Sequence, residues 1–178
     1  MTLPAMFQTG WAHGADAGRA FLVACGLRNA AGDADGDTVL AGWSLGALQT
    51  LRAATERPCK GLILLAPTAR FTASDDGWPG ASAASLCALR AGLRRDPERA
   101  LQSFFEQCEA PEALDPAAAG GRVRTALEGG LPPLLDGLDR LRDLDLREAA
   151  AGIDAPALLI HGRDDRVIPA EASARLAS

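Results

Sequence analysis

Two short, nearly uninterrupted apolar runs constrain the fold of this chain more than any other feature of its sequence. KGLILLAP occupies residues 60–67, and APALLIHG occupies residues 155–162. A strand that faces water on one side alternates apolar and polar residues, whereas a parallel strand with helices on both faces is apolar throughout. We therefore expect both runs to be strands of a parallel sheet, buried on both faces.

Two further strands, and the helices between them, are indicated by similar patterns. LPAMFQ and TVLAGW are predicted strands, and they alternate with helical stretches at residues 16–26, closed by Gly26, and at residues 45–56. The polar segment RNAAGDADGD, residues 28–37, is expected to be a turn with little regular structure. Strand–helix alternation is typical of parallel βαβ units. The expected fold class is therefore α/β, with a parallel sheet of about four strands flanked by helices.

The chain is expected to form a core with one helical insertion. The stretch between the two apolar runs has helical character and lacks strand patterns. We predict an α/β core made of residues 1–70 and 151–178, and a helical cap made of residues 71–150.

Several helices are expected within this cap. Residues 82–94 have helical character, and Asp96–Pro97 then supplies an N-cap followed by proline at the first helical position. The helix after Pro97 places four residues on one apolar face: Leu101, Phe104, Phe105 and Cys108. A loop is expected at residues 109–121, with helices at residues 121–128 and 131–150.

Composition excludes several classes of function. At 178 residues, with 48% hydrophobic and 23% charged residues, the chain has the composition of one soluble globular domain. Its net charge of −5 argues against general affinity for nucleic acid. No apolar run approaches the roughly 18 residues that span a bilayer. The start, MTLPAMFQTGW, lacks the pattern of a signal peptide, so we expect a cytoplasmic protein with no membrane partner.

The four cysteines, Cys25, Cys59, Cys87 and Cys108, are irregularly spaced and form no CxxC pair. Such spacing predicts neither a disulfide framework nor a zinc site. We expect reduced, partly buried thiols. The sequence implies no metal and no organic cofactor.

The segment GWSLG, residues 42–46, lies between an expected strand and an expected helix. Gly-x-Ser-x-Gly on a sharp strand-to-helix turn lets the backbone bend without crowding, so that the serine hydroxyl projects above the sheet. The N–H group after the serine can then stabilise an oxyanion, helped by the helix N-terminus. This pattern favours Ser44 as a catalytic nucleophile. The alternative is an ordinary tight connection in which Ser44 caps the helix.

A serine nucleophile needs a histidine base that is oriented by a carboxylate. On this type of sheet the order along the chain is Ser, Asp, His. LLIHGRDDRVIP, residues 158–169, ends an apolar strand with a polar loop that carries Asp164 and Asp165. Because sites assemble at the carboxyl ends of parallel strands, Asp165 is the predicted acid, with Asp164 as the alternative.

Three segments, GWSLGA, ARFTASDDGWPG and LLIHGRDDRVIP, together form a more specific pattern than the serine motif alone. From about Gly10 onward the chain resembles the pimeloyl-[acyl-carrier protein] methyl ester esterases of biotin synthesis. That family has an α/β-hydrolase fold with a helical cap, and it cleaves a methyl ester from a pimeloyl chain on acyl carrier protein. The resemblance implies that Ser44 is the nucleophile and Asp165 the triad acid. It also implies that the backbone N–H groups of Trp11 and Leu45 form the oxyanion hole.

The chain departs from this family at the histidine base. The family's histidine follows a further strand after the acid, but only 13 residues follow Asp165 here and none of them is histidine. The gap between the expected oxyanion loop and the serine turn is also short, so we expect less of the strand and helix that the family usually has there. His13, in the expected oxyanion loop, is the first alternative for the base, and His161 is the second. An esterase with Ser and Asp but no His is expected to be severely impaired.

Arginines of the predicted cap are candidate contacts for an acidic carrier protein, since the family docks its carrier through cap arginines. The cap arginines considered are Arg90, Arg94, Arg95, Arg99, Arg122 and Arg124. The candidate substrate- or partner-binding residues are Trp43, Arg99, Arg122 and Arg124. The alternative is a solvated surface without a partner, because residues 81–150 carry 9 Arg against 12 Asp and Glu, a net −3.

The predicted function is a serine carboxylesterase that hydrolyses the methyl ester of a pimeloyl-acyl carrier protein. One alternative is an impaired or incomplete hydrolase that acts as a binding module. Another is a thioesterase or acyltransferase that uses the same serine turn. The oligomeric state and the acyl chain length do not follow from the sequence.

Overall fold

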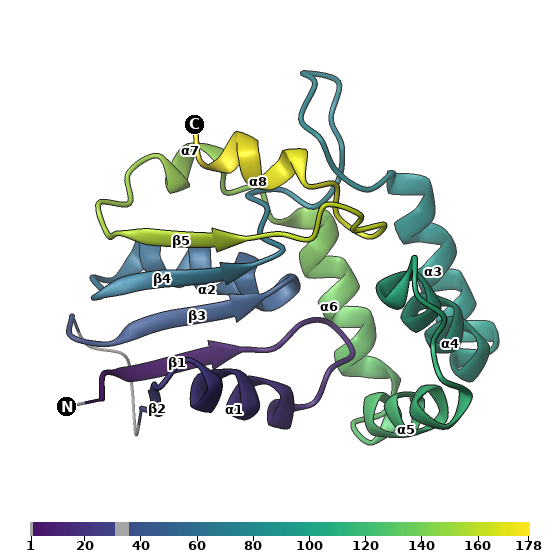
Figure 1. The fold of residues 1–178 in the computed structure, drawn as a ribbon. Coiled ribbons are helices and arrows are strands. Elements are labelled where there is room, and N and C mark those ends of the chain that lie inside the picture. Colours follow the sequence, from purple (N-terminus) through teal and green to yellow (C-terminus); the bar gives the residue numbers. More distant parts are fainter. Residues whose placement is uncertain (1, 31–35) are drawn as a thin grey trace.

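The computed structural model describes residues 2–30 and 36–178 and contains one parallel sheet. Its strands are β1 (Pro4–Gln8), β2 (Arg28–Asn29), β3 (Val39–Trp43), β4 (Gly61–Leu65) and β5 (Ala157–Ile160). They are arranged in the order β2-β1-β3-β4-β5, and every neighbouring pair is parallel. The prediction of an α/β fold with a parallel sheet is confirmed (Figure 1).

The sheet has one strand more than the four that the sequence predicts. The additional strand, β2, lies in the polar segment that was expected to be a turn, and Arg28 and Asn29 pair with Pro4 and Ala5 of β1. Both β2 residues are exposed, so their side chains carry no apolar signal. Residues 31–35 of the same polar segment lie outside the described residues.

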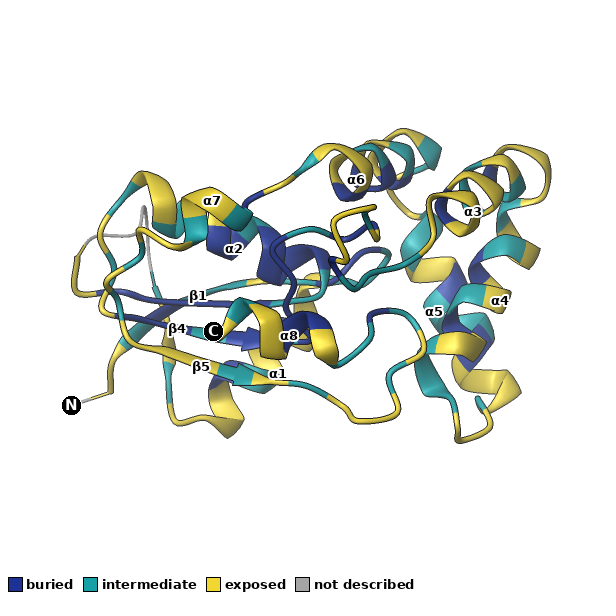
Figure 2. Cartoon of the chain, turned by 90° about the horizontal axis from the view of Figure 1, so that it is seen from above, coloured by how far each residue is buried: buried dark blue, intermediate teal, exposed yellow. Residues whose placement is uncertain are grey.

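Helices cover both faces of the sheet. Figure 2 shows α2 (Leu45–Glu56) and α7 (Arg147–Ala150) on one side, with α1 (Ala15–Ala24) on the other. Ala172 of α8 (Glu171–Leu176) packs in the same apolar core as Leu48 of α2, so α8 belongs to the α2 side. The apolar core on the α2 side is continuous with the packing of the helical segment between β4 and β5. A smaller cluster, built around Leu22 of α1, fills the opposite face.

The two apolar runs differ in burial. β4 lies between β3 and β5, and its Leu62 and Leu64 are 3% and 1% exposed. β5 has a neighbour on one side only, and its Leu158 and Ile160 are 54% and 44% exposed. The prediction that the 155–162 run is buried on both faces is therefore wrong. Leu158 and Ile160 are two residues apart and therefore share one face of β5. An apolar run identifies a strand but does not show whether both of its faces are covered.

Four helices follow β4 in the chain and lie beyond the carboxyl ends of the strands (Figure 1). They are α3 (Ala83–Arg95), α4 (Pro97–Glu109), α5 (Pro116–Leu127) and α6 (Leu131–Asp143). The predicted N-cap of α4 is present, because the Asp96 carboxylate accepts a hydrogen bond from Arg99 N at 3.1 Å. The assignment of residues 71–150 to a separate cap stays a prediction. Among the described helices, none has the length and apolar content needed to cross a membrane.

Two predicted boundaries in this helical segment are wrong. α5 begins at Pro116, inside the expected loop at residues 109–121, and the Asp115 carboxylate caps it by accepting from Ala118 N at 2.9 Å. The helix expected over residues 131–150 is interrupted after α6. There Leu146 N donates to the carbonyl of Ala69 at 2.8 Å, a long-range bond that takes the place of a helical one.

Candidate functional site

Ser44 occupies a strained turn between β3 and α2. Its backbone angles are φ 55° and ψ −119°, in a region that residues with a side chain rarely adopt. Ser44 N donates to the carbonyl of Leu65 at 2.9 Å, which ties the turn to the end of β4. The Ser44 side chain makes no capping hydrogen bond to α2, contrary to the structural alternative considered for it. Strain of this kind concentrates at functional sites, where the surrounding packing maintains it.

The two glycines of GWSLG allow close backbone contacts. A Cβ atom on Gly46 would lie 2.0 Å from the carbonyl oxygen of Gln8, at the end of β1. A Cβ atom on Gly42 would lie 2.4 Å from the carbonyl oxygen of Gly46. Both contacts involve backbone atoms that cannot rotate away. The glycine spacing therefore lets α2 pack directly against the ends of β1 and β3.

Trp11 lies in the loop that follows β1, next to a second strained residue. Ala12 has φ 62°, and Trp11 is 4% exposed. The Trp11 indole Nε1 donates to the Leu134 carbonyl of α6 at 2.8 Å, and its ring contacts Phe104 of α4 edge-on with centroids 4.7 Å apart. Two helices beyond the sheet thus fix the loop that carries the predicted oxyanion amide. The other predicted amide, of Leu45, belongs to the first residue of α2, where no intrahelical acceptor exists.

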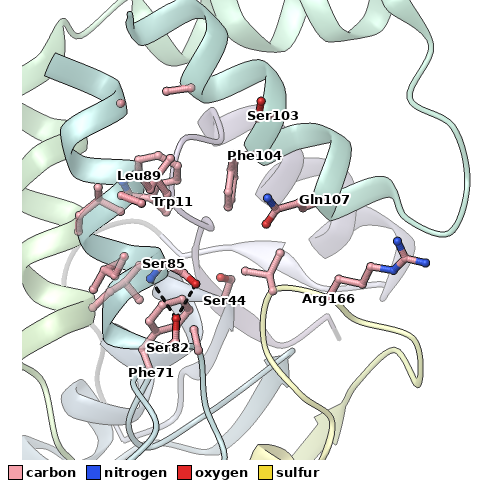
Figure 3. Close-up of a pocket in the computed structure, with 18 of the residues that line it drawn as sticks. Trp11, Ser44, Phe71, Ser82, Ser85, Leu89, Ser103, Phe104, Gln107 and Arg166 are labelled. Carbon is pink, nitrogen blue, oxygen red and sulfur yellow. Dashed lines mark hydrogen bonds between the residues drawn. The ribbon is translucent and has the colours of Figure 1, made fainter. Parts of the chain in front are cut away.

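A cavity of about 790 Å³ opens at the carboxyl edge of the sheet, and Trp11, Ser44 and Asp165 all line it. Figure 3 shows Ser44 at its base, between Phe71 and the side chains of α4. Its apolar walls come mainly from the helical segment: Phe71, Leu86, Leu89, Phe104, Leu138 and Leu141. The cavity joins a serine hydroxyl and a carboxylate to an apolar space that suits an alkyl chain.

Asp165 is fixed by three donors. Its Oδ1 accepts from Val167 N at 2.8 Å and from Ile168 N at 2.9 Å, and its Oδ2 lies 3.4 Å from His161 Nε2. Burial disfavours the charged carboxylate, but these donors outweigh it and lower the pKa of Asp165. Asp164, the alternative acid, is exposed and does not line the cavity.

His13 lies near Ser44 but does not line its cavity: a Cβ atom on Gly10 would lie 3.5 Å from both His13 Nδ1 and Ser44 Cβ. His13 Nδ1 donates to the Trp11 carbonyl at 2.8 Å, and its ring lies against Trp43 with centroids 4.3 Å apart. His13 lines a second cavity of about 490 Å³, together with Trp43, Cys108 and Arg122. Burial lowers the pKa of His13, so its imidazole is neutral at pH 7. In the described part of the chain, neither His13 nor His161 lines the cavity that holds Ser44.

The predicted binding residues are divided between the two cavities. Arg99, with Arg95, lines the Ser44 cavity, and neither guanidinium forms an ion pair within residues 2–30 and 36–178. Arg122 is paired with Glu109 at the second cavity, which Trp43 also lines. Arg124 is exposed and lines neither cavity.

Of the four cysteines, Cys25 and Cys87 are exposed, so the expectation of partly buried thiols holds only for Cys59 and Cys108. Burial, with a contribution from the charge of Asp165, raises the pKa of Cys108 to about 12. The thiol is therefore protonated and unreactive at neutral pH. No group of three or more His, Cys, Asp or Glu side chains in the described ranges is arranged to hold a metal ion.

Sequence reasoning missed most of the residues that line the Ser44 cavity. Arg166 is at its rim, and Ser82, Ser103 and Gln107 contribute polar groups (Figure 3). For Arg166 a local signal existed, because it follows the predicted acid directly. Ser103 and Gln107 could have been suspected because they flank Phe104 on the same helix, but no local pattern shows that α4 faces Ser44.

Comparison with known proteins gives matches to both sequence and fold. A sequence profile described as the alpha/beta hydrolase family matches residues 3–178. The chain is 37% identical over 142 residues to a pimeloyl-[acyl-carrier protein] methyl ester esterase from Methylococcus capsulatus, covering 76% of this chain and 55% of that protein. A protein of the same name from Nitrosomonas europaea is 34% identical over 139 residues, with 74% and 54% covered. The chain thus spans about half the length of the curated relatives it matches.

Solved structures of hydrolases match nearly the whole chain. An esterase from Exiguobacterium antarcticum has a TM-score of 0.84 at 20% identity, covering 98% of this chain and 78% of that chain. An enol-lactonase from Burkholderia xenovorans has a TM-score of 0.78 at 14% identity, covering 99% and 79%. At these identities the likeness concerns the fold alone.

Proposed function

Because the chain belongs to the alpha/beta hydrolase family, we propose that it carries an esterase site with Ser44 as nucleophile and Asp165 as triad acid. One observation supports this proposal above all. Ser44 has a left-handed backbone at the β3–α2 turn and lines the same cavity as Asp165 and Trp11. In an ordinary strand-to-helix connection, nothing would require a strained serine to line the same cavity as a carboxylate.

The proposed reaction is acyl transfer followed by hydrolysis. Ser44 Oγ attacks the ester carbonyl carbon, and the N–H groups of Trp11 and Leu45 stabilise the tetrahedral oxyanion. The alcohol then leaves with a proton, and water releases the acid from the acylated Ser44. The first step requires a base that takes the serine proton. Among the described residues that line the cavity, no histidine is available for this role.

The proposed substrate is the methyl ester of a pimeloyl chain on acyl carrier protein. This choice rests on the names of relatives that are 34–37% identical to the chain. The apolar walls of the 790 Å³ cavity are compatible with an alkyl chain. A cytoplasmic location, expected from the sequence, stays a prediction.

Arg99 is the proposed contact for the acidic carrier, because it is exposed, lines the cavity and has no ion-pair partner in the described chain. Arg122 is a weaker choice because Glu109 already neutralises it. Arg99→Glu should weaken carrier binding and reduce its salt dependence, measured by fluorescence anisotropy across a salt titration. Arg28→Glu, on the distant edge strand β2, is the matched control and should leave binding unchanged. Equal effects of both substitutions would contradict docking at Arg99.

A second candidate function is a binding module without catalysis. The observation that favours it is the position of the two histidines, since His13 faces the second cavity and His161 is held in the loop of Asp165. In triad hydrolases, removal of one member lowers the rate by about 10⁴- to 10⁶-fold. We therefore expect slow turnover at most from these 178 residues, even with an intact nucleophile.

A fluorophosphonate probe tests the nucleophile separately from turnover. We expect wild-type protein to be labelled at Ser44, with the site read by mass spectrometry of the labelled peptide. Ser44→Ala should abolish labelling. Ser178→Ala removes an exposed serine outside the cavity and serves as the control. Absence of both labelling and turnover in folded wild-type protein would count against an active Ser44 nucleophile and favour the binding module or an incomplete hydrolase.

A panel of substrates then distinguishes the remaining alternatives. Matched p-nitrophenyl esters and thioesters of the same acyl chain should show a preference for the ester if the chain is an esterase. A preference for the thioester would favour the thioesterase or acyltransferase alternative. His13→Gln serves as a separate test of the base. Loss of residual turnover in that variant, with labelling retained, would assign the base to His13.

A further inference from the structure

The His161 side chain lies in a buried polar network beside the proposed acid. His161 follows β5 directly, and its side chain is 6% exposed. Its Nδ1 is hydrogen-bonded to Ser173 Oγ of α8, and its Nε2 lies 3.0 Å from the Ile168 carbonyl oxygen. The same Nε2 is 3.4 Å from Asp165 Oδ2. Both ring nitrogens therefore have polar partners within the folded chain.

The partners of His161 determine how many protons its ring carries. Ser173 Oγ donates its only hydrogen to the Pro67 carbonyl at 3.0 Å. It can then act only as an acceptor toward His161, so Nδ1 must carry a hydrogen. The Ile168 carbonyl and the Asp165 carboxylate also only accept, so Nε2 must carry a hydrogen as well. A ring with both nitrogens protonated is an imidazolium cation.

We propose that His161 is held as an imidazolium and positions the carboxylate of Asp165. Two acidic groups stabilise this cation: Asp165 from the loop after β5 lies next to the ring, and Glu171 at the start of α8 acts through its charge. The segment after β4 contributes the Pro67 carbonyl, through Ser173. A buried cation with two hydrogen-bonded nitrogens and a neighbouring carboxylate is a stable arrangement, because its charge and both donors are satisfied.

The cation acts on the oxygen of Asp165 that the backbone leaves free. Val167 N and Ile168 N hold Oδ1, whereas His161 Nε2 faces Oδ2. His161 is thus a positioning residue, and its importance for catalysis rests on the proposed role of Asp165 as triad acid. Burial by itself would lower the pKa of His161, but the bonds to Asp165 and Ile168 outweigh it, and the net shift is upward.

Nitrogen NMR of ¹⁵N-labelled wild-type protein tests the protonation state directly. At about pH 7 an ordinary histidine side chain, with a pKa near 6.5, is mostly neutral. We expect both His161 nitrogens to be protonated in most molecules at that pH. His13 is the internal control, because its lowered pKa predicts a neutral ring with a bare Nε2. A neutral His161 with a bare Nδ1 at pH 7 in folded protein would overturn the proposal.

Two carboxylate substitutions test the origin of the charge. Asp165→Asn should lower the titration midpoint of His161 more than Glu171→Gln does, because Asp165 contacts the ring and Glu171 acts only through its charge. Each variant removes one negative charge, so the two are matched. Equal shifts would show that general charge, and not the contact with Asp165, sets the protonation of His161.

Hydrogen exchange at Val167 and Ile168 tests positioning, because both amides donate to Asp165. In wild-type protein, their protection should fall as the pH rises through the His161 midpoint. In His161→Gln, protection should not change with pH in this range. Protection that is unaffected by the titration of His161 would overturn its positioning role. None of these readouts uses ester turnover or the reactivity of Ser44, so the two proposals can fail separately.

Discussion

Two strand-to-helix junctions contribute to the cavity, and they are held in different ways. The β3–α2 junction around Ser44 leaves an interior strand, and backbone atoms of its neighbours fix it. Gly46 packs against the Gln8 carbonyl of β1, and Ser44 N bonds to Leu65 of β4. The β5–α8 junction around Asp165 leaves an edge strand with a neighbour on one side only. Side chains hold this second junction, through His161 and Ser173.

The difference follows from the position of each strand in the sheet. An interior strand has rigid backbone on both sides, so a turn can be constrained by steric contact alone. An edge strand lacks one of these neighbours, so polar side chains must supply the constraint. The stability of the β3–α2 junction should therefore be sensitive to added side-chain atoms. The stability of the β5–α8 junction should be sensitive to protonation of its side chains.

Gly46→Ala should give the largest loss of stability. The added Cβ would lie 2.0 Å from the Gln8 carbonyl oxygen, so α2 or β1 must move. We expect the free energy of unfolding in urea to fall by more than about 3 kcal/mol. Gly121→Ala in α5 is the control, because within the described chain no atom other than those of its chain neighbours and its own helix backbone lies within 4 Å of its Cβ position. It should raise stability by up to about 1 kcal/mol, since alanine favours a helix. A loss of less than about 3 kcal/mol for Gly46→Ala would contradict backbone control of the β3–α2 junction around Ser44.

Paired leucine substitutions compare the interior strand with the edge strand. Leu64→Ala in β4 should lower the free energy of unfolding by about 2–5 kcal/mol, because Leu64 is 1% exposed. Leu158→Ala in β5 should change it by less than about 0.5 kcal/mol, because Leu158 is 54% exposed. Chemical denaturation measures both. Equal losses of the free energy of unfolding would mean that the face of β5 that carries Leu158 is covered in solution.

The smallest expected effect is a change of stability with pH that arises at the β5–α8 junction around Asp165. Because the pKa of His161 is raised in the folded state, its protonation stabilises the fold fully below the unfolded value of about 6.5. This contribution is lost as the pH rises through the higher folded value. The stability advantage of wild-type protein over His161→Gln should therefore shrink on going to alkaline pH. Denaturation series at several pH values measure it, and an advantage that grows with pH would contradict an imidazolium at position 161.

Local sequence patterns predicted much of the fold and the two reactive side chains of the proposed site. The Asp96–Pro97 signal gave the start of α4, and the GWSLG pattern gave the turn at Ser44. The same Asp–Pro signal was present at Asp115 and was missed within a segment rich in small residues. In each of these cases the deciding contact lies within a few residues of the chain, which is why a local pattern can report it.

The sequence by itself determined an α/β chain with parallel strands, a sharp turn at Ser44 and a polar loop at Asp165. Only the tertiary structure decided that β5 is an edge strand, that Arg99 lines the Ser44 cavity while Trp43 and Arg122 line another, and that His13 lines that second cavity. Strand type and turn shape depend on the nearest residues in the chain. Which strand lies at an edge, and which cavity a side chain enters, depends on contacts between segments that are far apart in sequence, and no local pattern records those contacts.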